Sequence, residues 1–299
     1  MVSTAVAHSG PLSEPMCWVN GFRVDPDGAA VTVRDRGLTL ADGCFETMRA
    51  YSGTIFGLDA HLDRLATTAA RLEIPYAAHI GESVAQAVRA LREARADAVV
   101  RLTLTRGTGT GLAPAGGALA TPPTVILLAD RLPAVPAHMA DHGLRVSIAP
   151  GRRNEHAPTA GLKTLSYTDA VLALMTARAR GADDALFRDT AGHLSEATAS
   201  NLFLVIRGVV HTPPASCGIL PGITRRAVLD ILTGLDIPVE EAPIPAAAIA
   251  AADEIFLTSS LREIAPVTAV EGRPVGDGHV GVLTREVRDR YSALVTRDS

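Results

Sequence analysis

Lys163 is the residue whose type and position most directly suggest chemistry. It is the only lysine among the 28 basic residues, and it lies in the otherwise uncharged segment GLKTLSY. A lysine amine in apolar surroundings has a lowered pKa, acts as a nucleophile near neutral pH and forms a Schiff base with a carbonyl group. The alternative is a surface lysine whose stem packs against the protein. Because solubility does not explain a single lysine among arginines, the pattern favours a chemical role.

Glu196 is a second candidate, in the segment HLSEATASNLFLV. The small residues that follow it allow a flat ligand to approach the backbone closely. A carboxylate at this place could pair with a protonated ring nitrogen. The alternative is a surface glutamate at a turn.

Two segments could bind an anion through backbone and hydroxyl groups. Pro221 and Gly222 precede a predicted helix with Ile223 and Thr224 in its first turn. The unpaired N–H groups and the dipole of a helix start attract anions. The predicted strand EIFLTSS ends in further hydroxyls that suit a phosphate, those of Thr258, Ser259 and Ser260. An ordinary helix start and a polar strand end are the alternatives.

Arg64 lies at the edge of the apolar face of a predicted helix. A guanidinium in that position can reach inward to an anion. The alternative is a solvated arginine or an ion pair with a neighbour such as Asp63.

The elements that must position these residues are both helices and strands. In one segment, apolar residues recur at spacings of three and four, which predicts a helix over 58–72 with a single buried face. Alternating or continuous apolar runs predict strands. The further expected helices span 82–97, 166–180, a stretch from about Gly222, 245–252 and 280–294, and the expected strands span 99–106, 123–130, 144–150, 184–188, 201–206 and 254–260. The fold class is therefore an α/β or α+β mixture.

Length and composition predict a globular chain with a sizeable core. The 299 residues are 47% hydrophobic and 20% charged, which excludes disorder of the whole chain. At roughly 150 residues per domain, two domains are expected. The expected division is a flexible N-terminal tail (1–15), an N-terminal α/β domain (16–130), a proline-containing linker (131–143) and a C-terminal domain (144–299).

Several function classes are disfavoured by charge and cysteine content. The formal net charge of −4 shows no basic excess, so nucleic acid is not expected as a partner. Cys17, Cys44 and Cys217 are far apart and lack zinc-site spacing, which predicts reduced thiols, a cytoplasmic protein and no metal. No segment approaches the ~20 apolar residues of a membrane span, so no membrane association is expected.

Taken together and in order, six segments resemble the class IV aminotransferases, the fold type IV enzymes that depend on pyridoxal 5′-phosphate (PLP). The segments are DRGLTLADGCFE, HLDRL, GLKTLSY, LSEATASNLFLV, LPGITR and LTSSLREIAPV. The resemblance extends from about Trp18 to the C-terminus. It implies a two-domain fold with PLP in the cleft between the domains, a C-terminal PLP-binding domain, a homodimer, and an amino donor and a 2-oxo acid as small-molecule partners.

The resemblance also implies roles for individual residues. Lys163 corresponds to the Schiff-base lysine that moves the substrate's α-proton, and Glu196 to the partner of the cofactor's ring nitrogen. Tyr167 corresponds to a tyrosine near the ring hydroxyl, although its spacing from Lys163 differs by one residue. The residues implied to hold the phosphate are Arg64, Ile223, Thr224 and Ser260, with Ser259 as a helper.

The first motif indicates a branch of the family. DRGLTLADG is similar to the pattern of D-amino acid transaminases and aminodeoxychorismate lyases, with Ala41 in place of a usual glycine. The leading expectation is therefore a transaminase acting on a D-amino acid or an (R)-amine. The alternative is aminodeoxychorismate lyase, which converts 4-amino-4-deoxychorismate to p-aminobenzoate and pyruvate. Branched-chain amino acid aminotransferase ranks third, although FETMR is close to that branch's motif.

The substrate's carboxylate needs a cation that the family pattern does not supply here. Gly111 and Ala113 stand where well-known D-amino acid transaminases hold an arginine and a histidine. Another arginine must then bind the carboxylate. The candidates are Arg34, Arg36, Arg49, Arg152, Arg153 and Arg262.

Overall fold

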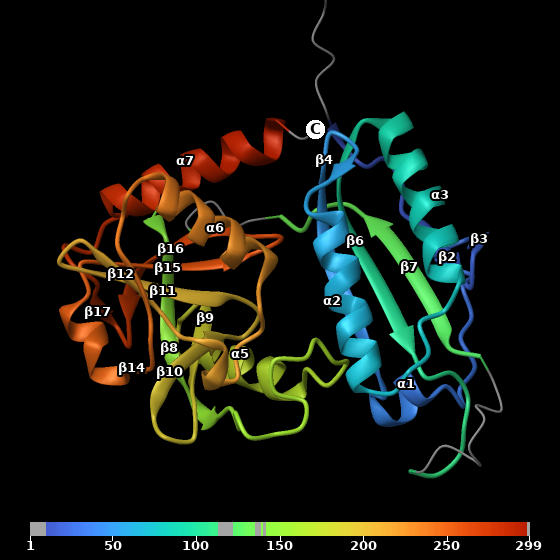
Figure 1. The fold of residues 1–299 in the computed structure, drawn as a ribbon, viewed down its shortest axis with the longest axis horizontal. Helices are drawn as coiled ribbons and strands as arrows, with labels where there is room; N and C mark the ends of the chain where they lie inside the picture. Colours follow the sequence, from blue (N-terminus) through green and yellow to red (C-terminus); the bar gives the residue numbers. More distant parts are fainter. Residues whose placement is uncertain (1–9, 113–121, 135–138, 140–141, 298–299) are drawn as a thin grey trace, which may run out of the picture. The chain divides into compact units, whose positions relative to one another are not determined.

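The computed structural model describes residues 10–112, 122–134, 139 and 142–297. The chain divides into two compact units, each a mixture of helices and strands (Figure 1). The first comprises Met1–Pro133, Lys163–Leu165 and Val295–Ser299, and the second comprises Ala134–Leu162 and Ser166–Leu294. The expected mixed α/β fold class is confirmed. Within this division, the segment Lys163–Leu165 belongs to the first unit although the chain before and after it belongs to the second.

The first unit is built on one mixed sheet with the order β3-β2-β7-β6-β4-β5, and β1 also pairs with β6. The longest pairing joins β4 to β6, with Gly43 opposite Thr105 and Ala50 opposite Ala98. The strands are β1 (Gly10–Pro11), β2 (Met16–Val19), β3 (Phe22–Val24), β4 (Gly43–Tyr51), β5 (Thr54–Ile55), β6 (Ala96–Thr105) and β7 (Thr124–Asp130). The strands predicted over 99–106 and 123–130 are confirmed as β6 and β7.

Two longer helices pack against this sheet (Figure 1), α2 (Leu58–Arg71) and α3 (His79–Ala94), and α1 (Arg36–Leu40) is a single short turn. The predicted apolar face of α2 is confirmed, because Leu65 and Ala69 are fully buried and Leu58, Leu62 and Leu72 pack beside them. The helix predicted over 82–97 begins and ends three residues earlier. Arg95 has a φ of 48°, which ends α3 and releases the next residues into β6.

Part of the segment expected as a flexible tail over 1–15 is described. Residues 1–9 lie outside the described residues, but Gly10 and Pro11 pair with Ala96 and Asp97, and the Leu12 side chain is buried. Burial of Leu12 provides the reason for this anchoring. In the expected linker over 131–143, residues 135–138, 140 and 141 also lie outside the described part of the chain.

The second unit contains a larger mixed sheet with the order β13-β12-β11-β15-β16-β8-β9-β10-β14, and β17 pairs with β16. Its strands are β8 (Leu144–Arg152), β9 (Asp184–Arg188), β10 (His193–Ala197), β11 (Asn201–Ile206), β12 (Val209–Thr212), β13 (Val239–Glu241), β14 (Ile244–Pro245), β15 (Glu254–Ser259), β16 (Glu263–Val270) and β17 (Arg273–Pro274). The strands expected over 184–188 and 201–206 are confirmed as β9 and β11. β10, which carries Glu196, was not predicted.

The helices of the second unit are α5 (Thr168–Ala179), α6 (Ile223–Gly234) and α7 (Val282–Arg297). They confirm the helices expected at 166–180, from Gly222 and at 280–294. The expected helix over 245–252 is instead a short 3-10 helix, Ala246–Ala251. Pro245, which begins this segment, cannot donate a backbone hydrogen bond, and none of the six residues is fully buried.

No described helix is both long and apolar enough to cross a membrane. The described residues contain no group of three or more histidine, cysteine, aspartate or glutamate side chains that could hold a metal ion.

Candidate functional site

Lys163 is fixed to the beginning of β4 by backbone pairing. The Phe45 N–H donates to the Lys163 carbonyl at 3.0 Å, and the Leu165 N–H donates to the Gly43 carbonyl at 3.0 Å. Gly43 permits this close approach, since a Cβ there would lie 2.7 Å from a side-chain carbon of Leu165 and 2.5 Å from the Leu104 carbonyl. The segment containing Lys163 is therefore joined to β4 by an isolated antiparallel bridge between Cys44 and Thr164, the residue after the lysine.

The side chain of Lys163 lies over an aromatic ring that a second cation also contacts. Its Nζ is 4.6 Å from the centroid of the Phe45 ring, and the Cζ of Arg101 is 3.8 Å from the same centroid. Both distances fall within the range of cation–π attraction. Arg101 is exposed on β6. An amine and a guanidinium are thus gathered around one buried phenyl ring.

Arg64 is held by a buried glutamate, Glu46, which also contacts His61, and the three residues form a cluster on the same unit. Its Nε and Nη2 donate to the two carboxylate oxygens of Glu46 at 2.8 and 2.6 Å, and His61 Nδ1 lies 2.7 Å from Oε2 of Glu46. Glu46 and His61 are fully buried. This two-pronged pairing fixes the plane of the guanidinium. Arg64 therefore pairs with Glu46, a partner that the sequence analysis did not name.

The protonation of this cluster follows from burial and hydrogen bonding. Burial acts to raise the pKa of Glu46, but hydrogen bonds from Arg64 and His61 outweigh it and hold that pKa below its usual value. Burial lowers the pKa of His61, although its hydrogen bond to Glu46 opposes this shift. The cluster at neutral pH is thus a charged Glu46–Arg64 pair beside a neutral imidazole that donates from Nδ1.

On the second unit, Glu196 is a buried carboxylate on β10, not a glutamate at a surface turn. Its Oε2 accepts from the Leu220 backbone N–H at 3.0 Å and from Asn201 Nδ2 at 3.3 Å. Its Oε1 lies 3.4 Å from Arg153 Nη2, and the Arg153 guanidinium stacks 4.6 Å from the Phe187 ring centroid. These contacts fix the orientation of the carboxylate.

Among the described residues, the start of α6 lacks a side-chain cap and lies beside Asn201. Gly222 is the residue before the helix. A Cβ at this position would lie 2.0 Å from Asn201 Oδ1, so a larger residue would require the Asn201 side chain to move. In the described structure no side chain caps the helix at this end. The Thr258 hydroxyl, opposite Asn201 in the β11–β15 register, is buried without a hydrogen-bond partner among the described residues. The unpaired N–H groups of a first helical turn and a buried hydroxyl without a partner are both groups that can bind an anion.

The remaining predicted cofactor residues lie on the second unit. Ile223 and Thr224 open α6, and the Thr224 hydroxyl is 3.4 Å from that of Tyr291. Ser259 ends β15, where its hydroxyl accepts from the Arg262 N–H at 3.2 Å, and Ser260 follows in the turn. Tyr167 precedes α5.

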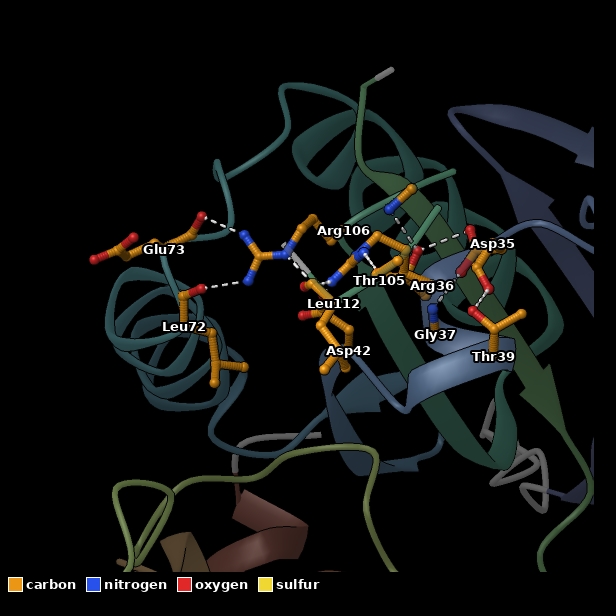
Figure 2. A network of polar contacts seen from close by, with 12 residues as sticks. Asp35, Arg36, Gly37, Thr39, Asp42, Leu72, Glu73, Thr105, Arg106 and Leu112 are labelled. Atoms are coloured by element: carbon orange, nitrogen blue, oxygen red, sulfur yellow. Dashed lines mark hydrogen bonds and ion pairs between the residues drawn. The ribbon is translucent and has the colours of Figure 1, made fainter. Parts of the chain in front are cut away.

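Arg36, one of the arginines expected to bind substrate, is buried in a polar network of the first unit (Figure 2). Its Nε donates to Asp42 at 2.8 Å, and its two terminal nitrogens donate to the carbonyls of Gly111 and Leu112 at 2.7 and 2.9 Å. Arg106 donates to the same Asp42 oxygen at 2.8 Å. All three nitrogens of Arg36 thus contact the protein. Gly111 is described, but the paired position Ala113 lies outside the described residues.

The other candidate arginines are scattered. Arg34 is exposed on the segment before α1, and Arg49 stacks 4.6 Å from the Tyr51 ring centroid. Arg152 donates to the carbonyls of Asp189 and Thr190. Arg153 contacts Glu196, and Arg262 forms an ion pair with the buried Asp184.

Phe45, Glu46, His61 and Arg101 were missed by the sequence analysis. A signal for Arg101 was available, because the alternation in VVRLTLTR places it on the sheet face opposite Val100 and Leu102. Phe45 lies opposite Thr103 in the β4–β6 register, two pairs along from Arg101 and therefore on the same face of the sheet. The pairing of Glu46 with Arg64 joins a strand to a helix and has no comparable sequence signal.

Comparisons with known proteins agree on one family. A family model described as amino-transferase class IV matches residues 43–270. The chain is 34% identical over 283 residues to a protein of Methanocaldococcus jannaschii named putative branched-chain-amino-acid aminotransferase, covering 94% of this chain and 96% of the relative.

Solved structures show the same similarity. The crystal structure of the Escherichia coli branched-chain amino acid aminotransferase has a TM-score of 0.88 and 28% identity, covering 95% of each chain. The crystal structure of 4-amino-4-deoxychorismate lyase from Pseudomonas aeruginosa has a TM-score of 0.78 and 32% identity, covering 93% of this chain and 98% of that one.

Proposed function

Since this chain belongs to the class IV aminotransferases, which use PLP, we propose that it transfers the amino group of a branched-chain amino acid to a 2-oxo acid, with Lys163 as the lysine that holds PLP covalently. The observation that carries the transaminase proposal is the single lysine of the chain, paired onto β4 with its amine over Phe45. The name of the M. jannaschii relative supports the substrate class. The sequence analysis ranked that class third.

The residues present fit PLP. The uncapped start of α6, the cradle at Gly222 and the partnerless Thr258 hydroxyl suit a phosphate group. Glu196 suits a protonated ring nitrogen, because a charge-assisted hydrogen bond to a carboxylate favours the protonated form. Tyr167 is proposed to contact the ring hydroxyl. The residues proposed to hold the phosphate are Arg64, Ile223, Thr224, Ser259 and Ser260.

When bound, PLP supplies an aldehyde that reacts with amines and a ring that takes up the electrons released at the substrate's α-carbon. The chain's own residues supply proton transfer and orientation. The Lys163 amine removes the α-proton of the substrate and later returns one. Glu196 provides the negative charge that keeps the ring nitrogen protonated. Glu46 acts indirectly, because it fixes the guanidinium of Arg64.

We propose Arg101 as the residue that receives a substrate carboxylate. It is exposed, and its guanidinium shares the Phe45 ring with Lys163, so a carboxylate bound to it would lie near the amine. Arg36, by contrast, is buried with its donors directed at Asp42 and two carbonyls. Conversion of Arg101 to Met is expected to raise KM for the amino acid while PLP affinity stays unchanged.

A homodimer is also proposed, as the family resemblance implies. Val33, Leu38 and Leu112 expose 78, 68 and 85% of their surface around α1, and exposed apolar side chains in such a group favour contact with a partner. Analytical ultracentrifugation tests this, with Leu38→Asp expected to shift the protein to monomer.

The three cysteines are free and buried, which supports a reducing compartment such as the cytoplasm.

The substrate proposal is tested by supplying single amino donors and measuring 2-oxo acid release from the PLP-loaded protein. L-Leucine and L-valine are expected to react. Reaction of D-alanine, D-glutamate or (R)-1-phenylethylamine alone would favour the second candidate, a D-amino acid or (R)-amine transaminase, which the DRGLTLADG motif supports. Release of pyruvate and p-aminobenzoate from aminodeoxychorismate, without reaction of the other donors, would favour the lyase. Turnover without covalent attachment at Lys163, read by borohydride reduction and peptide mass spectrometry, would overturn the role of that residue.

A further inference from the structure

Asp184 is a fully buried carboxylate that none of the roles above uses. It is the first residue of β9. Its Oδ1 accepts from the Thr198 hydroxyl at 2.6 Å and from the Ala185 N–H at 2.8 Å, and its Oδ2 forms an ion pair with Arg262 Nη1. A buried charge is costly unless it is paired and hydrogen-bonded. Asp184 meets both conditions through residues of two different turns.

The first of these turns links β10 to β11. Thr198 lies within it, and the turn is closed by a hydrogen bond from the Ala197 N–H to the Ser200 carbonyl at 2.8 Å. Glu196 precedes the turn, and Asn201, which donates to Glu196, follows it. A contact that fixes Thr198 therefore constrains both the Glu196 carboxylate and the Asn201 amide that donates to it.

The second turn links β15 to β16 and contains Ser260 and Arg262. The Arg262 N–H donates to the Ser259 hydroxyl at 3.2 Å, so the arginine that reaches Asp184 also orients Ser259 through its own backbone. Asn201 lies opposite Thr258 in the β11–β15 register. The two turns therefore lie at the same end of the paired strands β11 and β15, and Asp184 contacts both turns.

We propose that Asp184 is a positioning residue which, through Arg262 and Thr198, sets the turn of Ser259 and Ser260 relative to Glu196. This inference rests on the proposed function. It replaces the interpretation of Arg262 as a substrate-binding arginine, because its guanidinium is directed at Asp184. The consequence is that the chain's hold on the cofactor's phosphate and its hold on the ring nitrogen are coupled through one buried carboxylate.

The chain offers a matched control in the neighbouring residue. Asp183 is also buried, and its carboxylate accepts from the Arg145 backbone N–H at 2.8 Å. Arg145 belongs to β8, not to either turn. Asp183→Asn and Asp184→Asn each remove one buried charge from the same strand end. A purely structural role predicts similar effects from both variants.

The test measures the PLP dissociation constant by titration of the apoprotein and the ³¹P chemical shift of the bound phosphate. Asp184→Asn is expected to weaken PLP binding about tenfold and to move the ³¹P resonance, whereas Asp183→Asn leaves both close to wild type. Arg262→Met, which alters a partly exposed side chain, is expected to reproduce the effect of Asp184→Asn even if that variant folds poorly. A double variant with Asp184→Asn and Arg262→Met should bind PLP no more weakly than either single variant, because the two residues act through one contact.

Equal effects of Asp183→Asn and Asp184→Asn, or an unchanged PLP affinity and ³¹P shift in Arg262→Met, would overturn the positioning role. If the wild-type chain binds PLP and the Asp184→Asn and Arg262→Met variants bind it with the same affinity and ³¹P shift, only this inference is overturned. Failure of the wild-type chain to bind PLP removes the proposed function and this inference with it.

Discussion

The Lys163 region of the first unit and the Glu196 region of the second organise their polar groups in different ways. Around Lys163 and Arg64 the important groups are cationic side chains, held by Glu46, His61 and the Phe45 ring. Around Glu196 they are backbone N–H groups and turn residues, held by sheet register. The first region therefore depends mainly on protonation and charge, whereas the second also depends on the geometry of its turns.

The largest expected effect comes from removing the Lys163 amine. Lys163→Ala is expected to lower turnover by about 10⁴-fold, because both proton transfer and covalent attachment of the cofactor are lost. The measurement is 2-oxo acid release at saturating PLP. Lys163→Arg serves as the control, since it retains a cation near Phe45 but is expected to be equally inactive. Activity in Lys163→Arg would mean that the charge, not the nucleophile, matters.

Glu196→Gln tests the second region and is expected to slow a single turnover on the order of 100-fold. The amide can still accept a hydrogen bond from Leu220, but it carries no charge to stabilise a protonated ring nitrogen. PLP binding should persist. A single-turnover rate equal to that of the wild type would exclude this role for Glu196.

Glu46→Gln tests whether the first region depends on charge. It leaves Arg64 next to a neutral amide in a buried site, with an expected cost of about 3 kcal/mol in the unfolding free energy. Urea unfolding of the apoprotein measures this cost. Glu82→Gln, at an exposed position of α3, is the control and should change stability little. If both variants have the same stability, the Glu46–Arg64 pair is not a stabilising element.

The smallest expected effect is a pH dependence arising from His61. Its folded pKa lies below the usual 6.5, so the unfolded chain binds a proton more readily than the folded one. Stability is therefore fully present above pH 6.5 and falls as the pH decreases toward the folded pKa. Urea unfolding at pH 7.5 and 5.5 should show a smaller decrease in His61→Gln than in the wild type. His156→Gln, at an exposed position outside this cluster, is the control for the loss of a histidine as such.

Sequence periodicity predicted much of the fold, because the core residues of α2, β6, β7, β9 and β11 follow regular apolar patterns. It did not predict β10, since HLSEA contains three polar residues in five. The structure shows why these residues are tolerated in a sheet. Ser195 is buried but donates to the Cys217 carbonyl at 2.9 Å, and Glu196 accepts from Leu220. A sequence shows polarity, but not the distant groups that satisfy it.

The same limit applies to the site. Lys163 was identified because it is unique in composition, and the helix start at Ile223 because proline and glycine precede it. Arg36 was grouped with possible substrate ligands because nothing nearby in sequence shows that it is buried. Its partners Gly111 and Leu112 lie more than seventy residues away. Asp184 and Arg262 are similarly remote from each other, and only folding brings them together.

The placement of Lys163–Leu165 within the first unit has a consequence for biosynthesis. A nascent chain that has emerged through Pro133 already contains Phe45, Glu46, His61 and Arg64, and domains tend to fold as they leave the ribosome. It does not yet contain the lysine, which is translated thirty residues later, after the second unit has begun. The start of β4 stays without its backbone pairing to this segment until the segment arrives. The first unit can thus assemble its cation-holding framework early, while the proposed reactive amine is delivered only once the ribosome has passed into the second.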